Sequence, residues 1–225
     1  TNLIHSAYKN NIRNMIFLGS SCIYANNFLR EINEEDFLNG PLEKTNDAYS
    51  LAKINGIKMC QSYNEQYSTN YISLMPCNLF GINDKYDLNK SHVIPALIKK
   101  IHIAKKENRK EVIIWGTGKP LREFLFTDDL AEAILLILRK KNLKNSMYNI
   151  GSADELKIID LAKTIKKIIK YEGKIIFDKS KPDGTFRKKL NIRKITNLGW
   201  KQKTKFIEGL NLTYKDFLNR EKYAN

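Results

Sequence analysis

Tyr49 and Lys53 stand four positions apart in a segment with helical periodicity, so both side chains project from one face of a predicted helix. An ammonium group beside a phenol stabilises the phenolate, which lets such a phenol exchange a proton near neutral pH. Ser20 and Ser21 follow a short apolar run, at the end of a predicted strand where α/β proteins place their ligands. A Tyr-Lys pair alone usually adds only a surface contact. With a serine 29 residues before the tyrosine, the pair predicts a site that polarises a carbonyl group and delivers a proton during hydride transfer.

The elements that must position these residues alternate between strand-like and helix-like segments, which is typical of a parallel α/β architecture. We expect strands at 14–19, 71–75, 111–115, 146–150 and 174–177, and helices at 47–67, 93–106, 127–139, 155–170 and 206–218, after a first helix that ends near residue 9. Thr45 or Asn46 is expected to cap one helix, and Thr127 or Asp128 another. The alternation becomes less regular near residue 90, where we expect the passage into a smaller lobe that dips in and out of the main sheet.

The composition is that of a globular protein, because 42% of the 225 residues are hydrophobic and 28% are charged. The net charge of +15 favours anionic partners. Most of the excess is lysine scattered along helical segments, so we favour a solvated surface over a nucleic-acid site. The sequence predicts neither a membrane span nor a secretory signal, since no run of about 18 apolar residues occurs and residues 1–6 lack a signal-peptide layout.

The three cysteines fall in no metal-ligand spacing and leave one unpaired in any disulfide scheme, which fits a reducing cytoplasm. Cys60 is in phase with Tyr49 and Lys53, on the helix face expected to pack on the sheet, and is assigned to the core. From residue type alone, Cys22 would be a small core residue and His92 a helix cap or surface residue.

A dinucleotide-binding sheet normally opens with a strand, a glycine-rich turn and a helix. No segment of this sequence has that form: Gly116-Thr117-Gly118 follows a predicted strand but continues into Lys119-Pro120. Only two good parallel strands precede residue 90, fewer than a free-standing doubly wound sheet needs. We therefore expect the sequence to be the C-terminal part of a longer protein.

Eight short segments, in order along nearly the whole chain, resemble the GDP-L-fucose synthase family of extended short-chain dehydrogenases/reductases. The Tyr-x-x-x-Lys pair and the Asp-Asp-Leu-Ala start of a helix are shared across that superfamily. The segments SSCIY, SHVIP and SKPDGT are more specific to the GDP-L-fucose synthase family. The segments are 19–24 (GSSCIY), 49–53 (YSLAK), 75–81 (MPCNLFG), 91–97 (SHVIPAL), 115–118 (WGTG), 122–124 (REF), 128–131 (DDLA) and 180–185 (SKPDGT).

The resemblance implies an NADPH-dependent enzyme that converts GDP-4-keto-6-deoxy-mannose to GDP-L-fucose, by epimerisation at C3 and C5 and reduction of the 4-ketone. It implies an α/β fold in which residues 1–90 are the C-terminal portion of a Rossmann-like, doubly wound parallel sheet. Residues 91–225 would mainly form a smaller substrate-binding lobe, with some segments returning to the sheet. Relatives would carry about 90 residues more at the front, three strand-helix units of about 30 each. A cytoplasmic homodimer, built on long helices such as 47–67, is also implied.

Carried over position by position, Ser20, Tyr49 and Lys53 would form the reductase set, with Tyr49 as proton donor to the C4 oxygen. Cys22 and His92 would be the acid and base of epimerisation. The implied NADP(H)-binding residues are Tyr49, Lys53, Pro76, Asn78, Leu79 and His92. The implied substrate-binding residues are Asn78, Lys100, Trp115, Arg122 and Lys181. No metal ion is implied.

Four positions depart from the family pattern. Ala25 replaces a proline, Lys99 and Lys100 stand where relatives tend to carry arginine, and Cys77 stands where they usually carry threonine. A lysine preserves the charge but lacks the forked geometry of arginine.

Two other functions stay open from the sequence. Another nucleotide-sugar epimerase or dehydratase of the same superfamily would keep Tyr49 and Lys53 but has no use for Cys22 and His92. A non-catalytic remnant would use its positive charge to hold GDP-sugars or RNA. We also expect the 225 residues alone to be inactive and poorly stable, because the first two strands would expose an unpaired sheet edge.

Overall fold

The computed structural model of the protein describes residues 1–88, 91–140, 143 and 146–223. Three parallel strands form one sheet in the order β1 (Asn14–Leu18), β2 (Asn70–Pro76) and β6 (Met147–Ile150). Asn14 pairs with Asn70, and Ser73 pairs with Met147. The central strand β2 is buried from Tyr71 onward, as expected of a parallel strand covered on both faces. Residues more than 70 positions apart therefore share one sheet.

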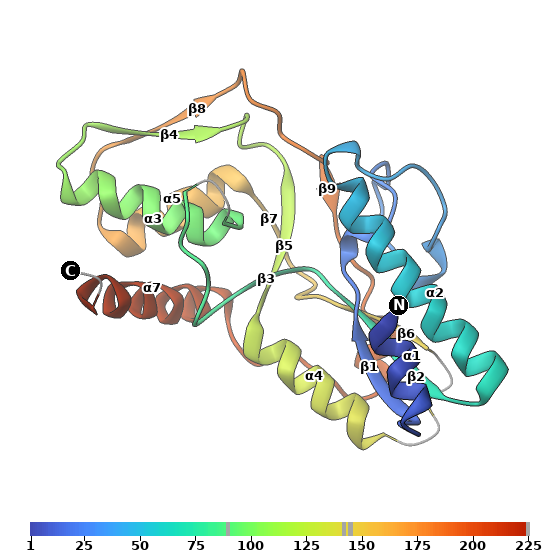
Figure 1. Cartoon of the computed structure of the whole chain (residues 1–225). Helices are drawn as coiled ribbons and strands as arrows, with labels where there is room; N and C mark the ends of the chain where they lie inside the picture. The colour runs from blue at the N-terminus through green and yellow to red at the C-terminus, as the bar shows by residue number, and fades with distance from the viewer. Residues whose placement is uncertain (89–90, 141–142, 144–145, 224–225) are drawn as a thin grey trace.

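Helices α2 (Asp47–Tyr67) and α4 (Thr127–Arg139) lie on opposite sides of this sheet (Figure 1). Gly56 lets α2 approach β1 closely, because a Cβ at this position would lie 2.2 Å from Cζ of Phe17. Helix α1 (Asn2–Lys9) packs beside α2, with Tyr8 stacked on Tyr67 at 4.3 Å between ring centroids. These contacts hold β1 against the middle of α2 and α1 against its last turn.

The rest of the chain forms two further groups of strands. Strand β5 (Leu121–Phe126) pairs with β3 (Asn78–Phe80), β7 (Glu155–Lys157) and β9 (Arg187–Lys188), and β4 (Glu111–Trp115) pairs with β8 (Lys174–Asp178). One hydrophobic core lies around β2 and β6, and the short helix α6 (Arg193–Asn197) contributes Ile195 to it. Helices α3 (Val93–Lys106), α5 (Ile158–Ile169) and α7 (Phe206–Tyr223) surround a second core. The fold is mixed α/β with mostly parallel strand pairs.

The expected strands and helices are present, with two corrections. Residues Glu155–Lys157 form β7 rather than the first turn of a helix, and α5 begins at Ile158. The Glu155 carboxylate accepts hydrogen bonds from the guanidinium of Arg187, from Nη2 at 2.7 Å and from Nε at 2.9 Å. These bonds fix β7 beside β5 and β9. Asn46, one of the two residues predicted to cap α2, occupies its N-cap position, but its side chain makes no capping hydrogen bond. The capping prediction for α4 is wrong, because its N-cap is Phe126 and Thr127 is already the first residue of the helix.

Residues 147–150 pair with β2 and so return to the first sheet after the second group of strands has begun. The division near residue 90 remains a prediction, and residues 89 and 90 lie outside the described residues. Cys60 is 0% exposed, in the core position expected for it. Among the described residues, no helix is long and apolar enough to cross a membrane.

Candidate active site

The turn after β1 presents Ser20 and Cys22 at the carboxyl edge of the sheet. Ser20 is the N-cap of a single 3-10 turn, Ser21–Ile23, and its hydroxyl accepts a hydrogen bond from the amide of Cys22 at 3.2 Å. The Ser50 hydroxyl donates to the carbonyl of Cys22 at 2.9 Å. Helix α2 therefore fixes the backbone of the turn that carries both reactive side chains.

Tyr49 and Lys53 lie on one side of α2, one helical turn apart. The Lys53 ammonium donates to the carbonyl of Leu18 at 2.8 Å and lies 5.7 Å from the centre of the Tyr49 ring. The Tyr49 side chain is 45% exposed. Lys53 is therefore held at the last residue of β1, while the phenol of Tyr49 stays accessible to a ligand.

These four side chains share a cleft of about 410 Å³ with His92. The cleft is also lined by Pro76, Asn78 and Leu79, so all the residues predicted from the sequence as catalytic or cofactor-binding meet in one place. The remaining lining residues are Leu18, Gly19, Ser21, Asn46, Cys77 and Leu130. Their parent elements β1, β2, α2, α3 and α4 converge at this edge of the sheet.

His92 stands at the N-cap position of α3 and is exposed. Its side chain makes no capping hydrogen bond within the described residues, so the ring is available to the cleft. Burial raises the pKa of the nearby Asp84 carboxyl group, and the charge of His92 is among the effects that oppose this rise. A carboxylate thus lies close enough to His92 to interact with its charged form.

A second pocket of about 380 Å³ adjoins the cleft, because Asn78 lines both. Lys100, Trp115 and Arg122 also line it. The ammonium groups of Lys100 and Lys181 lie 5.3 and 5.7 Å from the Trp115 ring centre. The five residues predicted to bind substrate are therefore gathered around one site, with two lysines beside an exposed indole and Arg122 in the lining of the same pocket.

Arg122 lines the second pocket. Burial lowers the pKa of its guanidinium group, while the charges of Glu43, Asp183 and Cys22 raise it. The side chain is therefore partly removed from water and close enough to interact with the Cys22 thiol of the cleft, with Asp183 of the second pocket and with Glu43. A cation in this position suits an anionic group that spans both pockets.

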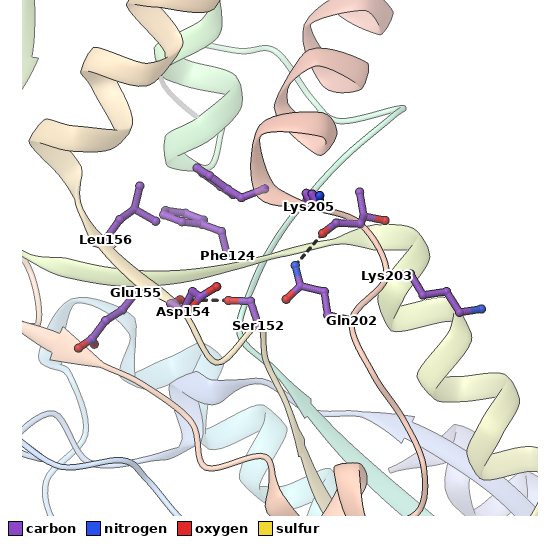
Figure 2. Close-up of a pocket in the computed structure, with 10 residues that line it drawn as sticks. Phe124, Ser152, Asp154, Glu155, Leu156, Gln202, Lys203 and Lys205 are labelled. Carbon is purple, nitrogen blue, oxygen red and sulfur yellow. Dashed lines mark hydrogen bonds between the residues drawn. The ribbon is translucent and has the colours of Figure 1, made fainter.

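A third pocket, of about 420 Å³, has a lining that shares no residue with these two (Figure 2). Phe124, the turn after β6 and the segment before α7 line it. Figure 2 shows its polar side chains bonded to nearby backbone: Gln202 donates to Thr204 and Ser152 to Asp154. None of the site residues predicted from the sequence lines this pocket.

Sequence reasoning missed several residues that the structure places at the site. Asn46 was considered only as a helix cap, and it lines the cleft that contains Tyr49 and Cys22. Asp183 lines the second pocket, and its carboxylate accepts hydrogen bonds from the amide and hydroxyl of Thr117 at 2.6 and 2.7 Å. Thr117 belongs to the motif WGTG and Asp183 to SKPDGT. The family specificity of SKPDGT was the sequence feature that could have identified Asp183 as a site residue.

Residues 1–151 match the NAD dependent epimerase/dehydratase family. The chain belongs to this family. Its relatives include a GDP-L-fucose synthase of Sinorhizobium fredii, 44% identical over 97% of this chain and 69% of that protein. The GDP-L-fucose synthase of Escherichia coli is 42% identical over 98% of this chain and 71% of that protein.

Among solved structures, a GDP-L-fucose synthetase from Naegleria fowleri bound to NADP matches with a TM-score of 0.90 at 28% identity, covering 98% of this chain and 71% of that one. The family membership and this match identify the fold as Rossmann-like. The chain spans about two thirds of the length of its curated relatives: 69% and 71% of these two bacterial proteins and 66% of two plant relatives.

Proposed function

We propose that the protein converts GDP-4-keto-6-deoxy-D-mannose to GDP-L-fucose, by epimerisation at C3 and C5 followed by NADPH-dependent reduction of the 4-ketone. The observation that carries this proposal is the convergence of Cys22, His92 and Tyr49 on one cleft. A simple reductase or 4-epimerase of the superfamily needs the tyrosine but not the other two. The identity to GDP-L-fucose synthases over nearly the whole chain supports the same assignment.

In the epimerisation, protons leave carbons adjacent to the ketone and return on the opposite face of the hexose. Removal of such a proton places negative charge on the ketone oxygen, where the hydroxyl groups of Tyr49 and Ser20 would stabilise it by hydrogen bonds. Inversion needs a base on one face and an acid on the other, and a thiol and an imidazole both exchange protons near neutral pH. Cys22 and His92, which line the same cleft, would fill these roles.

In the reduction, the C4 oxygen must gain a proton as the C4 carbon gains a hydride. Tyr49 would donate the proton, and Ser20 would orient the carbonyl oxygen. Lys53 would stabilise the phenolate that remains, since its ammonium lies over the phenol ring. The helix holds these two groups in register without any movement of the chain.

The residues of the cleft fit the nicotinamide and ribose end of NADP(H), which supplies the hydride when bound. The Lys53 ammonium has three N–H donors, and the bond to Leu18 uses one of them, leaving donors for ribose hydroxyl groups. Pro76 and Leu79 provide apolar surface for a flat ring. Tyr49, Lys53, Pro76, Asn78, Leu79 and His92 would together hold this end of the cofactor.

The nucleotide end of the substrate would occupy the second pocket. Lys100, Arg122 and Lys181 supply positive charge for the diphosphate, and the exposed ring of Trp115 offers a surface for guanine. Asn78, which lines both pockets, would contact the sugar between them. The hexose would then lie next to Cys22 and Tyr49.

We further propose that the protein is cytoplasmic and forms a homodimer through α2. Three free cysteines suit a reducing compartment. Leu51 on α2 is an apolar residue that is 57% exposed, which supports a subunit contact on this helix. Sedimentation at micromolar concentration is expected to give the mass of a dimer, with Leu51→Lys shifting it to a monomer. A monomer for the unsubstituted protein would contradict the dimer.

Solvent deuterium exchange tests the proposed reaction most directly, because epimerisation consumes no cofactor. GDP-4-keto-6-deoxy-mannose incubated with the full-length protein in D₂O is expected to gain deuterium at C3 and C5, measured by NMR. Cys22→Ser should abolish this exchange while largely sparing NADPH oxidation with a ketone that is already epimerised. Failure of the unsubstituted protein to exchange either position would contradict the proposal.

A further inference from the structure

We propose that Glu43 is a positioning residue that holds the phosphate-binding cations of the second pocket in place relative to the catalytic helix. This inference rests on the proposed function, in which the second pocket binds the GDP part of the substrate. Glu43 lies in the segment before α2, four residues ahead of its first residue. Its carboxylate contacts a loop that is far away in the sequence.

One oxygen of Glu43 accepts a hydrogen bond from the hydroxyl of Thr185 at 2.7 Å, across 142 positions of sequence. The other oxygen accepts from Thr45 at 3.2 Å. Thr185 is only 8% exposed, so its hydroxyl is bonded to a carboxylate away from bulk water. Figure 1 shows the chain between β8 and β9 passing beside the amino-terminal end of α2, where this contact forms.

Glu43 also faces Arg122. A Cβ placed on Gly184, where φ is +71°, would lie 3.2 Å from Oε1 of Glu43 and 3.5 Å from Nη2 of Arg122, so both groups lie against the same glycine. Burial raises the pKa of the Glu43 carboxyl group, but the bond from Thr185 and the charges of Lys188 and Arg122 outweigh it and the pKa is lowered. Glu43 is therefore an anion near the guanidinium of Arg122, on the same side of Gly184.

The loop that carries Lys181 is fastened at a second point. The Asp183 carboxylate accepts hydrogen bonds from the amide and hydroxyl of Thr117, in the turn after β4. Thr117 therefore ties this loop to the strands of the second pocket, and Glu43 ties it to the helix of Tyr49. Removing the bond between Glu43 and Thr185 should leave the cations of the second pocket present but no longer fixed with respect to the cleft.

A plain charge effect and a positioning effect predict opposite results. If Glu43 were only a negative charge beside an anion site, its removal would strengthen binding of GDP. If it positions Arg122 and the loop, its removal weakens binding, because the cations lose the arrangement that matches the diphosphate.

Binding of GDP to the full chain, measured by calorimetry and by the emission of the exposed Trp115, tests this inference. Glu43→Gln keeps an acceptor for Thr185 but removes the charge, and is expected to raise the dissociation constant of GDP by about five- to tenfold, as for the loss of one charge-assisted contact. Thr185→Val removes the hydroxyl that donates to Glu43 and should also raise the dissociation constant of GDP. Thr185→Ser keeps the hydroxyl and should bind GDP as the unsubstituted protein does. Glu65→Gln, which removes an exposed acid on α2, is the matched control and should leave binding unchanged.

A purely structural role for Glu43 would instead lower the free energy of unfolding and leave the affinity of the folded protein for GDP intact. Unchanged or stronger GDP binding by Glu43→Gln, with binding by the unsubstituted chain intact, overturns this inference alone. Failure of the unsubstituted chain to bind GDP overturns the proposed function, and the inference with it.

Discussion

The hydroxyl of Ser50 donates to the carbonyl of Cys22 at 2.9 Å and to the carbonyl of Asn46 at 3.0 Å. One buried side chain in the first turn of α2 thereby fixes both the turn that carries the thiol and a residue that lines the cleft. The distance between Cys22 and Tyr49 depends on this contact, since Tyr49 precedes Ser50 on the same helix.

Ser50→Ala is expected to reduce the free energy of unfolding by about 1 kcal/mol, the usual net contribution of a buried hydrogen bond. It should also slow deuterium exchange at C3 and C5 more than it slows ketone reduction, because it frees the Cys22 turn. Urea denaturation and NMR measure the two effects. Ser62→Ala, at an exposed position of the same helix, is the control and should change neither.

Lys53→Met removes the ammonium that bonds to Leu18 and lies over the Tyr49 ring. The rate of NADPH oxidation is expected to fall by a factor on the order of 10² to 10⁴, the usual contribution of acid-base catalysis. Steady-state kinetics with an epimerised ketone measures this rate. A loss of less than threefold would show that Tyr49 transfers its proton without Lys53.

Lys181→Ala is expected to weaken GDP binding by about tenfold, because it removes one of the charges that face the diphosphate. The same change should reduce the dependence of the dissociation constant on salt concentration, since fewer charges are screened. Titration calorimetry at two ionic strengths measures both quantities. Lys179→Ala removes a neighbouring lysine of the same loop and serves as the control.

Glu123 links stability to pH. Its side chain is 0% exposed and accepts hydrogen bonds from the amides of Ala153 and Leu190, and burial raises the pKa of its carboxyl group to about 7. Because the pKa is raised, the folded chain binds this proton more tightly than the unfolded chain. The resulting stabilisation is complete below about pH 4.5 and is lost as the pH rises through about 7.

The free energy of unfolding is therefore expected to fall between pH 5 and pH 8 by an amount on the order of 3 kcal/mol in the unsubstituted protein. Glu123→Gln should flatten this slope, because an amide does not titrate. Urea denaturation across the pH range measures it. Glu132→Gln, at an exposed carboxyl group paired with Lys203, should retain the slope, and equal slopes for all three proteins would refute the assignment.

Elements with strong local periodicity were predictable from the sequence, among them α2, α3 and the apolar strands β1 and β2. The short strands β3, β7 and β9 were not, because two or three residues carry no periodic signal and their conformation depends on pairing with β5. The segment at Glu155 is an example. Its sequence predicted a helix, whereas pairing with β5 and the bond from Arg187 make it a strand.

The sequence by itself determined which side chains could react and how near neighbours align: Tyr49 and Lys53 share a helix face because of the helical repeat. Only the tertiary structure decided that Cys22 and His92 line one cleft, and that Glu43 bonds to Thr185 in a loop 142 residues away. Such contacts depend on the path of the chain and on the burial of whole faces. No local pattern of residues encodes them.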